Sequence, residues 1–405
     1  MSATVSPPAG RAALTIIYLT VFIDLLGFGI ILPSLPYYAR DLGATGLGLG
    51  ILFSAYSVAQ LVGSAFLGRL SDRHGRRPIL LLSLAGSAAS MFLSGIATGL
   101  LALSLARALA GAFGGSIGTA QAYIADVTPR AERARYMGLL GASIGVGFVV
   151  GPALGAGLLA LGFGFRGAAF AAGGLAALNF ASALVRLPES RAAGAAGEHR
   201  PLSAVGWWRA ISRPGLQPLY WAVFLTTFAF VALETTLVFL ARDRFSLDSR
   251  HFGLVLVYLG VVVIVIQGGV VGRLSRRIGE RPVALTGAAL MGAALAALPA
   301  SPRLPVLLVL LGLVATGQGL ASPALSTLVS HASEGAEHGA LLGASQSLAA
   351  LARALGPVIA GQLYDLHAAA PYVTAGALSL VAGALLRGTA RSPQHAEGHP
   401  GRPTV

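Results

Sequence analysis

Four charged side chains stand within long apolar stretches of this chain, and their types suggest a chemistry. They are Asp24, Arg107, Glu234 and Arg353. An ionisable group at membrane depth is costly, so it needs a partner, water or a function. A carboxylate there can take up and release a proton or bind a cationic group, and a guanidinium group can pair with it. Asp24, Glu234 and Arg107 are therefore the candidates for proton coupling or substrate binding.

Each candidate also has a purely structural explanation. Glu234 lies in the middle of the apolar segment 228–240. An apolar medium disfavours the charged carboxylate, so we expect Glu234 to be protonatable near neutral pH and to form a proton or cationic-substrate site. The alternative for Glu234 is a hydrogen bond between helices. For Asp24 it is a neutralising pair with Arg107, and Arg353 is expected to act in helix packing or in a gate.

Uncharged polar residues also occur inside the apolar segments, where some are expected to line a cavity and others to bond helix to helix. With Arg353, the candidate cavity residues are Gln60, Gln121, Gln267, Gln318 and Gln346.

The elements that position these residues are predicted to be membrane-spanning helices. Only 11% of the residues are charged and 55% are hydrophobic, whereas a soluble protein carries about 25% charged residues. Segments of about 20 apolar residues span a bilayer as helices. Twelve are predicted, at 13–38, 46–70, 78–97, 99–125, 134–161, 165–187, 216–241, 250–273, 282–300, 303–330, 339–364 and 368–387. The fold class is an all-α membrane protein, and the 54 glycines suit close helix packing.

The chain contains no cysteine, and all 28 of its basic Lys+Arg residues are arginine. These absences exclude cysteine metal sites, a phosphate-binding P-loop lysine and a Schiff-base lysine. No metal or cofactor is expected, and we expect no enzyme activity.

The arginines sort by side of the membrane. Twenty of them fall on the side of the two termini, six on the other side, and two within spans. This positive-inside bias places both termini in the cytoplasm of a multi-pass protein of the inner membrane. It also accounts for the net charge of +13 without a nucleic-acid partner. The expected partners are the lipid bilayer, a small-molecule substrate and protons, with the chain as a monomer.

A charged turn at 68–78 recurs at 272–282, 204 positions further on. Gly68 and Gly75 of the first copy are expected to allow a close approach and a tight turn. A repeat at half the chain length indicates two homologous bundles of six helices. We predict an N-terminal bundle at 1–187, a cytoplasmic linker at 188–214, a C-terminal bundle at 215–388 and a disordered tail at 389–405.

A second pair of landmarks has nearly the same spacing. Gly151 and Pro152 lie in the fifth predicted span, and Gly356 and Pro357 lie in the eleventh. Proline within a helix removes a hydrogen bond and bends the helix. Two bent helices at equivalent positions suit two bundles that rock against each other.

These motifs together resemble those of the major facilitator superfamily. The turn 68–78 resembles its signature loop between the second and third helices. Segment 103–111, with Arg107, resembles its fourth-helix motif, although Ala110 replaces the usual glutamine. Segment 147–156, which includes Gly147 and Gly155, resembles the fifth-helix motif of drug/proton antiporters, and segment 22–38 resembles the first helix of tetracycline-efflux proteins.

The resemblance implies a charged latch on the cytoplasmic side. Asp72 would accept hydrogen bonds from a neighbouring helix N-terminus, where the helix dipole favours an anion. Asp126 is the expected partner of Arg76, and Arg73 and Arg77 hold the loop at the membrane surface. The latch would open when an acid is protonated. The alternative is that the arginines simply obey the inside rule. The second copy has Arg276 in place of the aspartate, so it is expected to be a static clamp that uses Glu334 and Glu337.

The resemblance implies secondary active transport by alternating access, as proton-coupled efflux of a small amphipathic or drug-like compound. One departure concerns the substrate. Tetracycline antiporters also carry acids in the third and ninth helices, and segments 78–97 and 282–300 contain none. The alternatives are a sugar or metabolite symporter or facilitator, and a membrane receptor or scaffold without transport.

Overall fold

The computed structural model describes residues 11–129, 132–190, 215–332 and 338–388, and within these ranges the chain is helical with no strand. The first group of helices is α1 (Arg11–Ile31), α2 (Leu35–Asp41), α3 (Gly46–His74), α4 (Arg76–Ile96), α5 (Leu100–Ala112), α6 (Ser116–Val127), α7 (Arg133–Ala160) and α8 (Gly164–Arg186). The second group is α10 (Gln217–Phe245), α11 (Ser249–Val265), η1 (Ile266–Val270), α12 (Val271–Ile278), α13 (Glu280–Ala297), η2 (Leu298–Ala300), α14 (Leu304–His331), α15 (His338–Leu366) and α16 (Ala370–Gly388).

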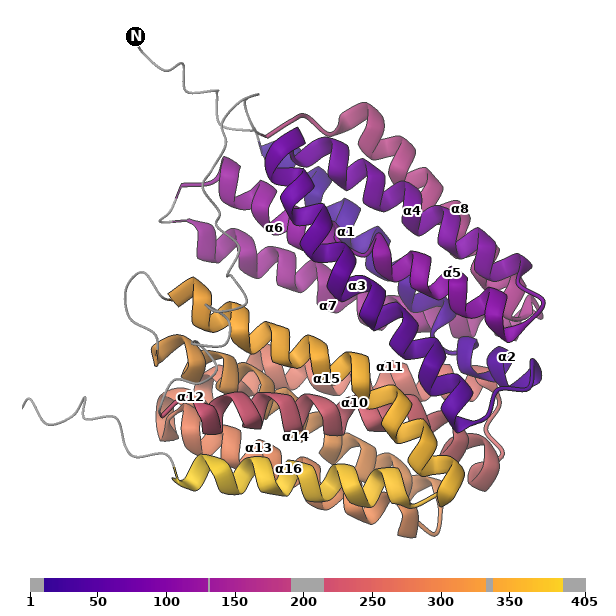
Figure 1. Ribbon diagram of the computed structural model, residues 1–405, viewed down its shortest axis with the longest axis vertical. Coiled ribbons are helices and arrows are strands. Elements are labelled where there is room, and N and C mark those ends of the chain that lie inside the picture. The colour runs from indigo at the N-terminus through magenta and orange to yellow at the C-terminus, as the bar shows by residue number, and fades with distance from the viewer. Residues whose placement is uncertain (1–10, 130–131, 191–214, 333–337, 389–405) are drawn as a thin grey trace, which may run out of the picture.

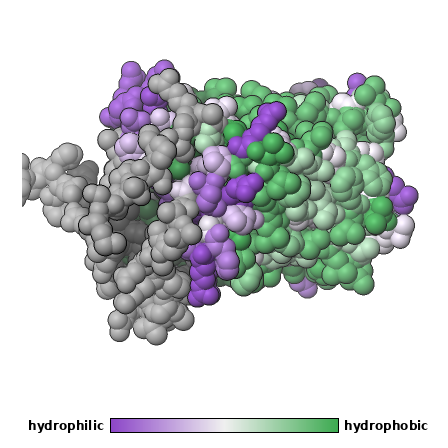
Figure 2. Space-filling model, turned by 90° about the horizontal axis from the view of Figure 1, so that it is seen from above, coloured by the Kyte–Doolittle hydropathy of each residue, from purple (hydrophilic) through white to green (hydrophobic). Residues whose placement is uncertain are grey.

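The predicted all-α membrane fold is confirmed. Each of the twelve predicted segments corresponds to one helix or to consecutive helices, and eleven of these units are long and apolar enough to cross a membrane. The remaining unit, α15, is a helix of 29 residues. Figure 2 shows a belt of hydrophobic surface with hydrophilic residues gathered towards its two ends. A belt of this kind is what an apolar solvent around the helices requires.

The helices depart from the predicted spans in two ways. Several are longer: α3 continues to His74 and α10 continues to Phe245, because charged residues extend these helices beyond their apolar part. Three predicted spans are interrupted: the first between α1 and α2, the fourth between α5 and α6, and the eighth by the π-helical turn η1. Gly114 and Gly115 lie in the second of these breaks.

The repeated turn forms the same backbone structure twice. Gly75 ends α3 with φ 97° and Gly279 ends α12 with φ 84°, and each is followed directly by the next helix. These positive φ values are readily adopted only by glycine. The last arginine of each copy bonds the end of another helix, since Arg77 donates to the Leu184 carbonyl at 2.7 Å and Arg281 to the Leu386 carbonyl at 2.8 Å. The two turns therefore occupy equivalent places in the two groups.

The two groups of helices come together at one end of the molecule (Figure 1). That end carries α2 and is called here the α2 end; the other carries the turns at Gly75 and Gly279 and is called the arginine-rich end. Between described residues, the hydrogen bonds and ion pairs that join the groups all lie towards the α2 end. For example, Ser54 Oγ donates to the Ala354 carbonyl at 2.6 Å. The predicted linker from residue 191 onward and the tail 389–405 lie outside the described residues.

Candidate functional site

A cavity of about 660 Å³ lies between the two groups of helices. Helices α1, α3, α5, α7, α10, α11, α14 and α15 all contribute residues to its wall. Its charged and polar lining residues are Asp24, Tyr56, Ser57, Gln60, Ser87, Arg107, Ser116, Glu234, Thr235, Gln267 and Arg353. Its phenylalanines are Phe28, Phe53, Phe113, Phe148, Phe230 and Phe252. The four intramembrane charges singled out from the sequence therefore face one cavity, whose wall is otherwise largely aromatic and aliphatic.

Asp24 is held by serine hydroxyls. Ser116 Oγ donates to its Oδ2 at 2.6 Å, and Ser87 Oγ donates to its Oδ1 at 3.1 Å. Ser116 is the first residue of α6, directly after the break in the fourth span. These two hydroxyl donors hold the carboxylate of Asp24 in place at the cavity wall. The predicted alternative, a neutralising ion pair between Asp24 and Arg107, is not formed.

Arg107 is almost fully buried, with 2% of its surface exposed. Its guanidinium carbon lies 4.7 Å from the ring centroid of Tyr56 and 5.2 Å from that of Phe28. Within the described part of the chain, its Nη1 atom has no hydrogen-bond partner. The two rings stabilise the cation through their faces.

Glu234 and Arg353 form the charged part of the other wall. Glu234 on α10 and Arg353 on α15 are both exposed to the cavity. Arg353 attracts Glu234 electrostatically, but among the described residues Glu234 has neither a hydrogen bond nor an ion pair. Glu234 thus differs from Asp24, because no neighbouring hydrogen-bond donor among the described residues holds its carboxylate.

Two of the five predicted cavity glutamines line the cavity and three do not. Gln60 and Gln267 line the cavity, and Gln60 donates to the Tyr56 hydroxyl at 3.1 Å. Gln121, Gln318 and Gln346 are not part of its wall. The cavity residues missed from the sequence are Tyr56, Ser57, Ser87, Ser116 and the phenylalanines. Serine and phenylalanine occur throughout the spans, so no sequence signal marks the few that face inward.

The predicted latch residues form a compact group of charges at the arginine-rich end. Arg76 pairs with Asp72 at 2.8 Å and with Asp126 at 2.9 Å, the partner suggested by the sequence. Glu189, which was not predicted, accepts hydrogen bonds from the backbone nitrogens of Arg76 and Arg77 at 2.9 and 3.2 Å and so caps α4. We call Asp72, Arg76, Asp126 and Glu189 the turn cluster.

The turn cluster lies within one group of helices. All four of its members belong to the segment 72–189, so the contacts among them do not join the two groups. Arg73 is exposed beside it. Gly68 does not serve a close approach in this conformation, since a Cβ atom built there meets nothing within 4 Å. Glu334 and Glu337, expected to complete the second copy, lie outside the described residues.

The glycine and proline motif packs helices together. Atoms of α1 lie where a Cβ atom on Gly147, Gly151 or Gly155 of α7 would stand. Close contact between α1 and α7 therefore requires these three glycines. Pro152 and Pro357 lie inside α7 and α15 and line the cavity, and Gly356 packs against Val231 and Phe228.

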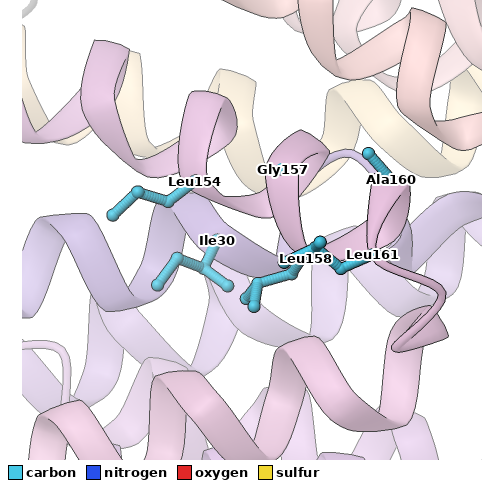
Figure 3. Close-up of a pocket in the computed structure, with 6 residues that line it drawn as sticks. All are labelled: Ile30, Leu154, Gly157, Leu158, Ala160 and Leu161. Carbon is cyan, nitrogen blue, oxygen red and sulfur yellow. The ribbon is translucent and has the colours of Figure 1, made fainter.

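A second hollow, of about 490 Å³, is lined by α1 and α7 (Figure 3). Its lining residues are Ile30, Leu154, Gly157, Leu158, Ala160 and Leu161. None of them carries a polar side chain, so this hollow offers nothing to orient a charged ligand. The central cavity is the better candidate site.

A bundle of apolar helices with a central cavity that holds charges from both helix groups defines a membrane transport protein. The Major Facilitator Superfamily profile matches residues 17–281 and 268–403, and the chain belongs to that family. It is 31% identical over 392 residues to the class C tetracycline resistance protein of Escherichia coli, covering 92% of this chain and 94% of that protein. It is also 29% identical to multidrug resistance protein 2 of Bacillus subtilis (strain 168), covering 89% and 91%.

A solved structure supports the same assignment. The crystal structure of the human organic anion transporter MFSD10 (TETRAN) matches with a TM-score of 0.70 and 27% identity, and covers 94% of this chain and all of that one. The relatives are transporters, so this chain is a multi-pass membrane transporter rather than an enzyme, as the sequence resemblance implied. Two of the relatives are named for resistance to tetracycline and to multiple drugs.

Proposed function

We propose that this protein exports a small amphipathic or drug-like compound across the inner membrane in exchange for protons. The observation that carries the proposal is Glu234, a carboxylate exposed to the central cavity and without a hydrogen-bond donor among the described residues. Such a group is free to exchange a proton for a ligand. The aromatic wall around it suits the flat, apolar body of a drug-like compound.

Proton and substrate compete for Glu234, and this competition couples substrate export to proton uptake. When Glu234 is ionised, it attracts a substrate with a cationic or hydrogen-bond-donating group. When a proton binds Glu234, that attraction is lost and the substrate is released. Asp24 is assigned the other role, a positioning acid of the cavity wall, because the hydroxyls of Ser87 and Ser116 hold its carboxylate in place. The two acids thus divide the work between proton exchange at Glu234 and substrate positioning at Asp24.

The orientation proposed from the arginines sets the direction of access. The arginine-rich end is taken to be cytoplasmic, so the α2 end faces outward, and both termini lie in the cytoplasm. The groups are joined towards the α2 end, and this supports a conformation whose cavity is accessible from the cytoplasm. We take the two groups as the two six-helix halves, which alternately expose the cavity as they rock.

The names of the relatives guide the choice of substrates but do not fix it. They refer to tetracycline, to multiple drugs and to organic anions. All three can be amphipathic aromatic compounds, which supports a cavity that binds such compounds. The absence of acids in the third and ninth spans distinguishes this chain from the tetracycline pattern, so the test uses a panel of ethidium, a neutral dye and fluorescein as well as tetracycline.

The test is substrate flux in proteoliposomes under an imposed pH gradient with the membrane potential clamped. One exchanged proton lets a gradient of one pH unit support about tenfold accumulation. Glu234→Gln should remove the dependence on the gradient while leaving downhill flux, and Asp24→Asn should lower the rate but keep the dependence. Glu132→Gln, an exposed acid at the arginine-rich end, is the control and should behave as the parent.

Three results would refute the proposal. If Glu234→Gln kept full coupling, Glu234 would not be the proton site. If accumulation followed the proton gradient in the same direction as the protons, the protein would be a symporter. Absence of flux for every compound of the panel would favour a receptor or scaffold.

A further inference from the structure

The end of the molecule opposite the turn cluster carries a second repeat, made of Ala-Arg-Asp. Residues Ala39, Arg40 and Asp41 close the first span, and the same three types recur 202 positions further on, at the end of the seventh span. The residue three positions before each arginine is aromatic, Tyr37 in the first copy and Phe239 in the second. The two copies stand at the ends of α2 and α10.

Each copy binds the other in the same way. Arg40 pairs with Asp243 at 2.6 Å, and Arg242 pairs with Asp41 at 3.5 Å. Arg40 also lies 4.9 Å from the ring centroid of Phe239, and Arg242 lies 5.8 Å from that of Tyr37. Every arginine thus meets an aromatic ring and an aspartate of the opposite copy. This is the reciprocal pattern that a two-fold axis produces. We call Tyr37, Arg40, Asp41, Phe239, Arg242 and Asp243 the outer clasp.

Neighbouring contacts tie the same two surfaces. Tyr37 Oη of the first group donates to the Leu247 carbonyl of the second at 2.7 Å. Within the second group, Tyr364 Oη donates to Asp243 at 3.2 Å and so supports this clasp residue. Asp365 at the end of α15 accepts hydrogen bonds from the backbone nitrogens of Gly46 and Leu47 at 2.7 and 2.8 Å. These two nitrogens open α3, so an acid of the second group caps a helix of the first.

We propose that the outer clasp is the outer gate of the transporter, closed in this conformation and broken whenever the cavity opens outward. The proposal rests on alternating access as proposed above. Its basis is that all six side chains contact the opposite group, so the contacts cannot survive separation of the two surfaces. The pairs are partly exposed, at 27% and 43% for Arg40 and Asp243, and each such pair shifts an equilibrium by only about two- to fivefold. A gate made of several weak contacts holds the closed state yet releases it within a transport cycle.

The natural absence of cysteine makes the test direct. Ser57, which lines the cavity, is replaced by cysteine and labelled from outside the cell with a membrane-impermeant maleimide. Labelling reports outward opening and needs no transport, so it can fail or succeed independently of the proposed substrate. Asp243→Arg places a third cation against Arg40 and Arg242, and we expect it to raise the labelling rate about tenfold.

The matched variants separate a gate from general damage. The charge swap Arg40→Asp with Asp243→Arg should return the rate to within about twofold of the parent, since it rebuilds one pair with reversed polarity. The milder Asp243→Asn should shift labelling in the same direction as Asp243→Arg but less, about twofold. Arg303→Asp reverses the charge of an exposed arginine that lies at the same end but outside the clasp, and it should leave the labelling rate unchanged.

A cross-link supplies a second measurement. Cysteines in place of Asp41 and Arg242, joined by a short reducible thiol cross-linker, should block labelling of position 57 from outside and stop transport, with recovery on reduction. The proposal is overturned if Asp243→Arg labels like the parent, if the charge swap labels as fast as Asp243→Arg alone, or if the cross-linked protein still admits the maleimide from outside.

Discussion

The two ends of this molecule both carry arginine–aspartate clusters, but the clusters join different partners. The turn cluster connects α3, α4, α6 and the segment after α8, all within one helix group. The outer clasp connects α2 with α10, and so one group with the other. A charge cluster is broken or formed by a change of conformation only when its contacts cross the interface between the two helix groups. A cluster whose contacts stay inside one group is expected to persist through the transport cycle and to brace that group.

Burial separates the two clusters as well. The Arg76 side chain of the turn cluster is 8% exposed, whereas Arg40 and Arg242 of the outer clasp are 27% and 41% exposed. A buried cation loses more when its partners are removed, because water cannot replace them. The clasp arginines can be rehydrated when the gate opens. The turn cluster is accordingly suited to stability, and the outer clasp to reversible closure.

The largest effect, a loss of folding stability, is expected from removing the buried arginine of the turn cluster. Arg76→Gln leaves Asp72 and Asp126 facing each other without their shared cation, and frees the Ser71 hydroxyl that Arg76 bonds at 3.1 Å. Because both acids are partly exposed, we expect the free energy of unfolding to fall by about 2–3 kcal/mol. Thermal unfolding in detergent measures it. Arg73→Gln, a neighbouring exposed arginine, should unfold at the parent's temperature.

The opposite result for Arg76→Gln would be informative. If the variant kept its unfolding temperature but lost transport, the turn cluster would be a conformational switch, as the sequence resemblance implied. The distinction between a bracing cluster and a gating cluster would then be wrong.

Substitutions at two glycines of one helix are expected to have smaller effects, of opposite sign, on the labelling rate at position 57. Gly50 and Gly68 are 18 residues apart on α3, which is about five full turns, so they share a face. A Cβ atom on Gly50 would overlap the Pro357 carbonyl of α15, whereas one on Gly68 meets nothing within 4 Å. Gly50→Leu should therefore push the groups apart at the outer end and raise labelling at position 57 from outside about fivefold.

Gly68→Leu tests the step of the transport cycle in which the cavity closes towards the cytoplasm. If α3 approaches α15 at the cytoplasmic end when the cavity opens outward, a leucine there should hinder closure and lower the same labelling. The two substitutions are thus expected to have opposite signs. Equal signs would show that α3 does not pivot between its two ends.

Much of this architecture could be predicted from the sequence because it depends on local patterns. Apolar segments of membrane length predicted the helices, and Gly75 predicted the tight turn that its positive φ confirms. The four intramembrane charges were identifiable because charge is rare in such segments. The contact of Arg76 with Asp126 was also accessible, since both residues belong to helix ends on the same side.

The remainder depends on helix rotation and distant contacts. Whether Gln60 or Gln121 faces the cavity depends on how each helix is rotated, and the weak amphipathicity of membrane helices does not fix that. Asp24's partners come from α4 and α6 and are serines, a residue type found all along the spans. The outer clasp joins residues some 200 positions apart; its Ala-Arg-Asp repeat is visible in the sequence, but only the folded arrangement shows that the copies bind each other.

The smallest effect, a minor loss of folding stability, is expected at Asp248. This acid lies beside the outer clasp, but its hydrogen bonds stay within one helix group. It caps α11 by accepting hydrogen bonds from the His251 backbone nitrogen at 2.8 Å and from the His251 ring at 2.7 Å. The backbone hydrogen bond is the main reason that the pKa of Asp248 lies below its ordinary value. Asp248→Ala should cost about 0.5–1 kcal/mol, as lost N-caps do.

The pH dependence of this loss has a definite sign. Because the pKa of Asp248 is lowered in the folded protein, its contribution is complete above about pH 4, the range in which an unfolded aspartate is already ionised, and it fades as the pH falls further. Parent and Asp248→Ala should therefore differ in unfolding temperature at pH 7 and converge in acid. Labelling at position 57 should be the same in both, because Asp248 bonds only its own helix. A rise in labelling would mean that any acid at the outer end influences the gate, and the assignment of gating to the reciprocal Arg-Asp pairs would fail.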